Sequence, residues 1–273
     1  MSFDSREFSI AQGIPVRLYR FHRGVTLWLY CTADRNIELG VQTFRSVLGG
    51  ISDSGIQQTG DAKSDGLTIT APASLDVVQP FRAFPPSDPI GLSVFDMHYG
   101  DTEARLAGSY RISSVGFPAL DRCKIKCVTR DSEMGEPGLL DAYMRTCTAV
   151  LGDRRCKVDL ESYRVDLSID SRNGLSVFSS DLSDYPAGWF TGGYVAWAVG
   201  GGEFDRRFID RHISNELQLL GGTVGIPPAA QLRAYPGCDF LASTCHSKFG
   251  NSLNNRGIPH LQLDSPFDGN QVW

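Results

Sequence analysis

The stretch Val16-Arg-Leu-Tyr-Arg-Phe-His-Arg-Gly-Val-Thr-Leu-Trp-Leu-Tyr-Cys31 carries the pattern that decides the fold. Apolar and polar side chains alternate over residues 16–21, as they do in a strand with one buried face. His22-Arg-Gly24 has the composition of a turn, and residues 25–31 are again rich in strand-forming side chains. The stretch therefore predicts an antiparallel hairpin.

Similar strand-like stretches recur along most of the chain. They cover residues 67–70, 90–97, 104–113, 123–127, 163–169, 189–199, 207–214 and 216–220. Gly200-Gly-Gly202 suits the tight corner of a second hairpin. A short helix is expected at residues 75–84, with Ser74 as its cap and Pro85-Pro86 as its end. The fold class that follows is mostly β, with two barrel-like or sandwich-like domains.

Gly135 and Pro137 interrupt the strand pattern and predict a domain boundary. We expect an N-terminal β-rich domain at residues 1–135 and a connector at residues 136–160, with one or two helical turns at 139–147. A second β-rich domain should occupy residues 161–273. Its tail, residues 237–273, is rich in Gly, Asn, Ser and Pro, so it should need a cross-link to hold it in place.

The composition argues against several classes of function. Apolar residues make up 41% of the 273 residues, which is enough for a folded core, and the net charge of −5 argues against general nucleic-acid binding. No apolar run reaches the length of a membrane span, and the polar start predicts no secretory signal. In the reducing cytoplasm that this implies, seven cysteines favour metal ligation over a disulfide framework.

Four cysteines form two pairs, Cys147-x8-Cys156 and Cys238-x6-Cys245. Thiolate sulfur suits zinc and iron–sulfur clusters. Structural zinc sites use shorter spacings, whereas wider loops suit a larger object such as a four-thiolate cluster. Spacing alone leaves a cluster, zinc and uncoordinated thiols open. The basic residues that could offset an anionic cluster are Arg145, Arg154, Arg155, Lys157 and Lys248.

The other candidate residues point to structure. Cys31 ends an apolar strand and is expected to be a buried free thiol. Cys123 and Cys127 share one face of an alternating segment and are expected to be core or half-buried thiols. The five histidines are scattered, and no nucleophile, acid–base pair or phosphate-binding motif is found. The sequence therefore predicts no catalytic residue.

The tail has a more specific pattern in Gly237-Cys-Asp, Cys245 and the residues that follow. Those residues are Phe249, Asn251, Asn255, Gly257 and Pro259. Together with Cys147-x8-Cys156-Lys-Val-Asp, the pattern resembles the tail-tip and baseplate hub proteins of long-tailed phages. This family includes gene-transfer-agent hubs and is similar to the phage lambda tail tip protein L. The resemblance covers most of the chain and is strongest over residues 147–259.

The resemblance implies a structural virion protein built from β-rich hub domains, made in the host cytoplasm. It implies a ring of copies beneath the distal tail protein, in contact with central tip, fiber or tape-measure proteins. It also implies a [4Fe–4S] cluster on Cys147, Cys156, Cys238 and Cys245, with zinc as the alternative. A tail-borne cell-wall hydrolase or a receptor-binding module, the latter using the aromatic residues 189–197, are the competing functions.

Overall fold

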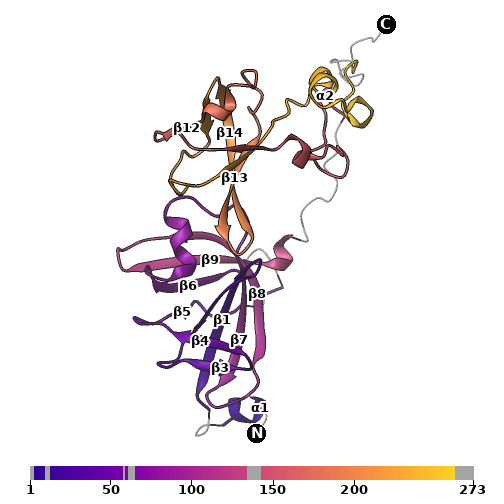
Figure 1. Cartoon of the computed structure of the whole chain (residues 1–273). Helices are drawn as coiled ribbons and strands as arrows, with labels where there is room; N and C mark the ends of the chain where they lie inside the picture. The colour runs from indigo at the N-terminus through magenta and orange to yellow at the C-terminus, as the bar shows by residue number, and fades with distance from the viewer. Residues whose placement is uncertain (1–2, 10–12, 58, 61–64, 134–142, 262–273) are drawn as a thin grey trace. The chain divides into compact units, whose positions relative to one another are not determined.

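The computed structural model describes residues 3–9, 13–57, 59–60, 65–133 and 143–261 (Figure 1). The chain divides into two compact units, Met1–Glu136 and Pro137–Trp273. Each unit is built around its own β-sheet. The mostly β class predicted from the sequence is confirmed.

The first unit contains a nine-stranded sheet in the order β3-β4-β2-β1-β7-β8-β9-β6-β5. Its strands are β1 (Pro15–Arg23), β2 (Thr26–Cys31), β3 (Ile37–Leu39), β4 (Gln42–Ser46), β5 (Ser52–Asp53), β6 (Leu67–Pro72), β7 (Gly91–His98), β8 (Arg105–Gly116) and β9 (Arg122–Thr129). A short helix, α1 (Phe3–Glu7), and two 3-10 helices, η1 (Asp76–Arg82) and η2 (Arg130–Glu133), accompany them.

The predicted hairpin is confirmed as β1 and β2. The strands pair antiparallel with Phe21 opposite Trp28, and Gly24 takes a φ of 50° in the turn, which favours glycine. The alternation also predicts the buried face correctly on β9, where Cys123, Ile125 and Cys127 are buried while Lys124 and Lys126 are exposed. Period-two patterning therefore places the core of this unit.

The helix expected at residues 75–84 is a 3-10 helix, and the expected cap is wrong. Leu75 occupies the N-cap position, and no side-chain hydrogen bond caps the helix. Pro80 lies inside the helix and has no N–H to donate. The segment still buries Val77 and Val78 against the sheet core.

The second unit contains a seven-stranded sheet in the order β10-β16-β13-β14-β15-β12-β11. Its strands are β10 (Val165–Leu167), β11 (Ser171–Arg172), β12 (Ser176–Phe178), β13 (Tyr194–Gly200), β14 (Glu203–Ile213), β15 (Glu216–Leu219) and β16 (Leu232–Tyr235). The 3-10 helices η3 (Leu160–Tyr163), η4 (Ser180–Leu182) and η5 (Ser252–Asn254) and the helix α2 (Ala242–Phe249) complete it.

The three-glycine corner is confirmed between β13 and β14, since Gly200, Gly201 and Gly202 all have positive φ. The preceding strand is shorter than predicted. It begins at Tyr194, because the chain turns at Trp189, where the Trp189 N–H donates to the Pro186 carbonyl.

One helix prediction near the cysteines is wrong, and one helix there was not predicted. The described part of residues 139–147, from Tyr143 onward, is not helical, and residues 139–142 lie outside the described residues. The tail, for which no helix was predicted, forms α2, and Gly250 ends it in the left-handed conformation with φ 60°. Sequence signals for this helix were present in His246 and Lys248 in the last turn and glycine directly after it.

Candidate functional site

The four predicted ligands all lie in the second unit, outside its sheet. Cys147 and Cys156 precede η3, Cys238 follows β16, and Cys245 lies on α2. Every strand of the seven-stranded sheet falls between Cys156 and Cys238 in the sequence. We call residues 143–163 together with residues 236–261 the cysteine region.

The cysteine region has a small apolar core of its own. Ala149, Cys156, Val158 and Phe249 are buried together, and the Cys147 and Cys238 side chains pack against them. The rings of Tyr163 and Phe249 meet edge to face with centroids 5.3 Å apart. Because this cluster draws side chains from both parts of the region, it brings sequence-distant cysteines together.

Cys245 joins the same site through Asn251. The Cys245 thiol donates to the Asn251 carbonyl, with Sγ and O 3.3 Å apart. The Asn251 side chain in turn donates to the Cys156 carbonyl, with Nδ2 and O 2.6 Å apart. One asparagine therefore ties the α2 cysteine to the first pair.

Three of the four sulfurs accept N–H groups. The backbone N–H of Phe240 lies 3.3 Å from Cys238 Sγ, and that of Arg256 lies 3.3 Å from Cys147 Sγ. Asn251 Nδ2 lies 3.7 Å from Cys156 Sγ. Hydrogen bonds to ligand sulfurs are one of the means by which proteins stabilise and tune thiolate-bound clusters. N–H donors of this kind are therefore present at Cys147, Cys156 and Cys238.

The remaining residues of the tail pattern hold the two parts of the region together. A Cβ on Gly257 would lie 2.6 Å from the Arg145 carbonyl oxygen, so only glycine allows this approach. Asn255 accepts the Gly257 N–H at 2.9 Å, and the Ile258 N–H donates to Met144 at 2.9 Å. The Cys147 N–H donates to the Phe240 carbonyl at 2.8 Å.

The thiols are unbridged, and all seven cysteines are free. Burial raises the pKa of the Cys238 thiol, an effect that the Phe240 N–H opposes and that Cys245 and Cys156 reinforce. A metal or cluster must displace such protons, so its binding should strengthen with rising pH. Within the described residues, no three His, Cys, Asp or Glu side chains form a group that could hold a metal ion.

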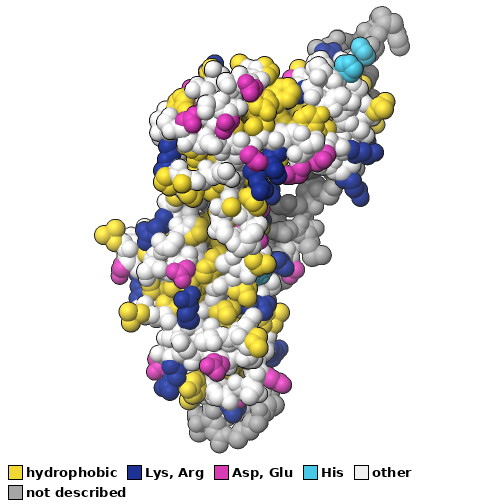
Figure 2. Space-filling view, in the orientation of Figure 1, with side chains coloured by type: hydrophobic (Ala, Val, Ile, Leu, Met, Phe, Trp, Pro, Cys, Tyr) yellow, Lys and Arg dark blue, Asp and Glu magenta, His cyan; other side chains and the backbone are white. Residues whose placement is uncertain are grey.

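The basic residues expected near the cysteines differ in their surroundings. Arg154 and Lys157 are exposed, and Figure 2 shows Lys and Arg side chains in dark blue on the visible surface of the cysteine region. Arg155 pairs with Asp153, with Nε and Oδ2 3.3 Å apart, and Arg145 donates to the Leu261 carbonyl. Lys248 and Arg155 are half-buried.

Cys31, Cys123 and Cys127 are core thiols, as predicted. Each is at most 3% exposed, and all three belong to the first unit, whereas the predicted ligands belong to the second. Burial raises the pKa of Cys127 to about 12, so this thiol stays protonated.

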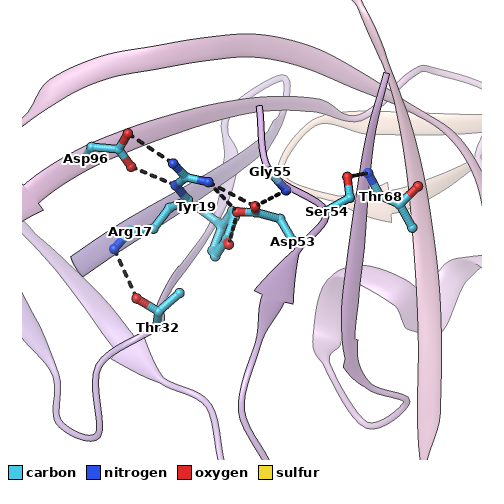
Figure 3. A network of polar contacts seen from close by, with 8 residues as sticks. All are labelled: Arg17, Tyr19, Thr32, Asp53, Ser54, Gly55, Thr68 and Asp96. Carbon is cyan, nitrogen blue, oxygen red and sulfur yellow. Dashed lines mark hydrogen bonds and ion pairs between the residues drawn. The ribbon is translucent and has the colours of Figure 1, made fainter. Parts of the chain in front are cut away.

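A second polar site in the first unit was not predicted. The Arg17 guanidinium contacts Asp53 at 2.9 Å and Asp96 at 2.7 Å, and Tyr19 Oη donates to Asp53 Oδ2 at 2.5 Å (Figure 3). The Gly55 N–H also donates to Asp53. The network lies on the wall of a cavity of about 1120 Å³. Its residues are far apart in sequence, so no local pattern signals it.

The polar network is internally balanced. Burial of Asp53 opposes its ionisation, but hydrogen bonds from Tyr19, Arg17 and Gly55 outweigh it and hold the pKa of Asp53 below 3.8. Burial and the Asp53 hydrogen bond raise the pKa of Tyr19 and keep it protonated. The network therefore ties the short strand β5 to β1 and β7.

Comparison with known proteins shows that part of the chain is similar to a family of phage proteins. Residues 188–264 match the family described as "Phage conserved hypothetical protein BR0599". This segment includes Cys238 and Cys245 and ends beyond α2. An uncharacterized protein of Xylella fastidiosa (strain 9a5c) is 34% identical over 114 residues, which cover 38% of this chain. The match spans 23% of that protein's length.

One solved structure matches almost the whole chain. A chain from the virion of the native gene transfer agent particle superposes with a TM-score of 0.79 at 19% identity, covering 99% of this chain and 97% of that one. No helix in the described part of the chain is long and apolar enough to cross a membrane. The predicted resemblance to phage and gene-transfer-agent proteins is confirmed by the family segment at residues 188–264 and by the fold of the whole chain.

Proposed function

We propose that this protein is a structural subunit of a phage-like virion, located in the hub ring at the tail tip. The observation that carries the proposal is the end-to-end structural match to a chain of the gene transfer agent particle. The phage family segment at residues 188–264 supports it independently. The proposed partners are further copies of the chain, the distal tail protein above it, and central tip, fiber or tape-measure proteins. A closed ring requires head-to-tail contacts between copies.

Within that role, the cysteine region binds a [4Fe–4S] cluster through Cys147, Cys156, Cys238 and Cys245. Support comes from the shared apolar core and from the N–H donors at three sulfurs. The cluster acts as a staple, because it joins α2 and the tail to the loop before η3. Few apolar side chains are available there to do the same work.

The cluster is tested by purifying the protein without oxygen and measuring iron, sulfide and zinc. We expect a brown protein with about four irons and four sulfides per chain. A colourless protein with one zinc would replace the cluster with the alternative metal and leave the virion role in place. Protein that holds neither metal would overturn the staple.

The virion role is tested in cells that encode the chain. Purified particles should contain the protein, and an antibody against the first unit should label the tail tip in electron micrographs. Particles that lack the protein, or that assemble normally after its gene is deleted, would overturn the role whatever the metal content.

A further inference from the structure

One face of the seven-stranded sheet carries a row of aromatic side chains. Tyr194 on β13 lies opposite Phe208 on β14 and opposite Tyr235 on β16 (Figure 1). Residues that face each other across neighbouring strands project to the same side of a sheet. The Tyr194 and Tyr235 rings stack with centroids 4.6 Å apart. Val195 and Ala234, the next residues in the alternation, belong to the buried core. The three rings therefore lie on the face that points away from the core.

Two positions further along these strands, the same face carries two arginines. Ala196 lies opposite Arg206 on β14 and opposite Arg233 on β16. The Arg233 guanidinium lies 4.3 Å from the centre of the Phe204 ring, and that of Arg206 lies 6.0 Å from the Tyr194 ring. Stacking uses the flat side of a guanidinium, and its N–H donors lie in the plane, in a geometry that suits a carboxylate. The aromatic–arginine face, as we call it, consists of Tyr194, Phe204, Arg206, Phe208, Arg233 and Tyr235.

The charges around the aromatic–arginine face favour an acidic partner. Asp166 lies at its β10 edge, and Arg164 pairs with this residue at 3.2 Å and with Glu161 at 2.9 Å. Asp205 alternates with the residues of the face, and its charge raises the pKa of the buried Arg207 on the opposite side. With the two arginines of the face included, three guanidiniums stand against two carboxylates here, whereas the whole chain carries a net charge of −5. Complementary charge steers association and selects partners.

The composition of the face is that of a protein-binding surface. Phe208 is 46% exposed, and Leu220, whose N–H donates to the Phe208 carbonyl, is 59% exposed. Large apolar side chains that gather on one exposed face mark interaction sites more often than scattered ones do. Aromatic residues and arginine are also the residue types that dominate the binding energy of protein interfaces.

The chain contains an acidic and apolar segment that matches this surface. Residues 262–273 lie beyond the described part of the chain and read Gln-Leu-Asp-Ser-Pro-Phe-Asp-Gly-Asn-Gln-Val-Trp. The segment has two carboxylates, Asp264 and Asp268, on either side of Phe267, and it has no Lys, Arg or His. At roughly 3.3 Å per residue, an extended segment of this length can cross several strands spaced about 4.8 Å apart.

We propose that the aromatic–arginine face of one copy binds residues 262–273 of a neighbouring copy. Asp264 and Asp268 pair with the two arginines of the face, and Phe267 packs on its aromatic row. The contact joins two different surfaces of the chain, so it is heterologous, and contacts of this kind close rings. The inference rests on the proposed function for the identity of the partner as a second copy, and it requires no metal at the cysteines.

The first test is a cross-link in the full chain. The photoreactive residue p-benzoylphenylalanine replaces Phe267, the protein is mixed with an isotope-labelled copy, and the products of illumination are identified by mass spectrometry. We expect cross-links between labelled and unlabelled chains, with the attached peptides in β13, β14 or β16. The control position is Phe8, an aromatic side chain of the first unit that is 89% exposed. It should give no cross-link to these strands.

The second test reverses the charges on both sides of the contact. Arg206→Glu with Arg233→Glu should weaken self-association, measured by analytical ultracentrifugation, by about tenfold for each arginine. Adding Asp264→Lys and Asp268→Lys to the same chain should restore it, a rescue that a misfolded face would not show. Arg154→Glu is the matched control, since Arg154 is an exposed arginine of the same unit outside the face. Its self-association should equal that of wild type.

Several results would overturn the inference. Cross-links confined to one chain would mean that the segment binds its own copy, and wild-type protein that stays monomeric at every attainable concentration would exclude the contact. Charge reversal without loss of association, or a loss that the added lysines do not rescue, would remove the arginines from it. Particles that hold the protein at the tail tip but cross-link the position of Phe208 only to another virion protein would overturn the second copy as partner. The virion role would stand in each case.

Discussion

The nine-stranded unit and the cysteine region hold their chains in place by different means. In the first, a continuous core of nineteen buried residues runs under the sheet, from Tyr19 on β1 to Cys127 on β9. In the second, the core contains four buried residues. Burial of apolar surface at roughly 25 cal/mol per Å² can stabilise the first unit, but it gives the second far less.

The cysteine region compensates with specific contacts. Asn251 bridges Cys245 and Cys156, Gly257 passes against the Arg145 backbone, and Lys248 anchors α2. Such contacts are directional, and a hydrogen bond among them contributes only about 1–3 kcal/mol net. One chain therefore combines a unit whose stability is distributed over a large core with a region whose stability depends on a few specific contacts.

The largest effect is expected from the removal of one proposed cluster ligand. Cys238→Ser should abolish iron binding, because a four-thiolate cluster loses a ligand, and trypsin should then cut at the exposed Arg154 and Lys157. The first unit should remain a resistant fragment. Iron analysis and a tryptic time course give the readout. The control is Cys127→Ala, a buried thiol in the first unit that should keep full iron. Full iron in Cys238→Ser would contradict the ligand assignment.

Truncating a side chain in the core of the first unit should destabilise that unit and leave iron binding unchanged. Phe21 is fully buried, so Phe21→Ala should lower the free energy of unfolding of the first unit by about 3–5 kcal/mol. Iron content should not change. Urea unfolding followed by fluorescence measures the loss, and Val25→Ala in the same hairpin, where Val25 is 73% exposed, is the control. Iron loss in Phe21→Ala would show that the two regions are not independent.

The close approach of Gly237 to the Thr191 backbone gives a smaller effect that belongs to the second unit. Gly237→Ala places a methyl group against the Thr191 carbonyl, and the shift needed to fit it should cost about 3 kcal/mol. We expect weaker retention of iron in air and faster tryptic cleavage. Gly174→Ala is the matched control, since nothing lies within 4 Å of its added Cβ. Equal behaviour of the two variants would refute the role of this close approach.

The smallest effect concerns the polar network of the first unit. Asp53→Asn should cost about 2 kcal/mol at neutral pH, because a buried acceptor for Arg17 and Tyr19 is weakened. The pKa of Asp53 is held below its ordinary value in the folded state, so its contribution is present above that ordinary value and is lost as pH falls through the lower folded value.

The difference between Asp53→Asn and wild type should therefore shrink on acidification below 3.8. Urea unfolding at a series of pH values measures it. Asp34→Asn, at a side chain that is 83% exposed, should leave the curve unchanged. A difference that grows toward low pH would contradict the assigned sign.

The sequence predicts features that follow from the alternation of neighbouring residues, and it misses features that depend on contacts between residues far apart in the chain. Alternation places most strands, the β1–β2 hairpin and the buried face of β9, because period-two patterning is a property of neighbouring residues. It misses the shortened start of β13, since aromatic residues at positions 189 and 190 have strand propensity but pack in a turn. Tertiary contacts override propensity there.

In the candidate site, too, local sequence patterns predict some features and tertiary contacts determine the others. The spacing of the cysteines and the tail pattern predict the four thiols as ligands, and this assignment stays a prediction. In the structure, Asn251 links Cys245 to Cys156, and the Phe240 carbonyl accepts the Cys147 N–H. The contacts of Lys248 could not be predicted, because they depend on carbonyls of Trp189 and Gly237 that only the folded chain brings to one point. Arg17 and Asp53 meet for the same reason.

The order of the elements along the chain gives the proposed staple a second effect on stability. Since β10 to β16 all lie between Cys156 and Cys238, a group held by both pairs closes the chain into a loop that contains the entire seven-stranded sheet. A closed loop of roughly 80 residues lowers the entropy of the unfolded chain enough to favour folding by about 4–5 kcal/mol on the chain-entropy account. The cluster would thus stabilise strands that it never touches, by limiting how far their two ends can separate.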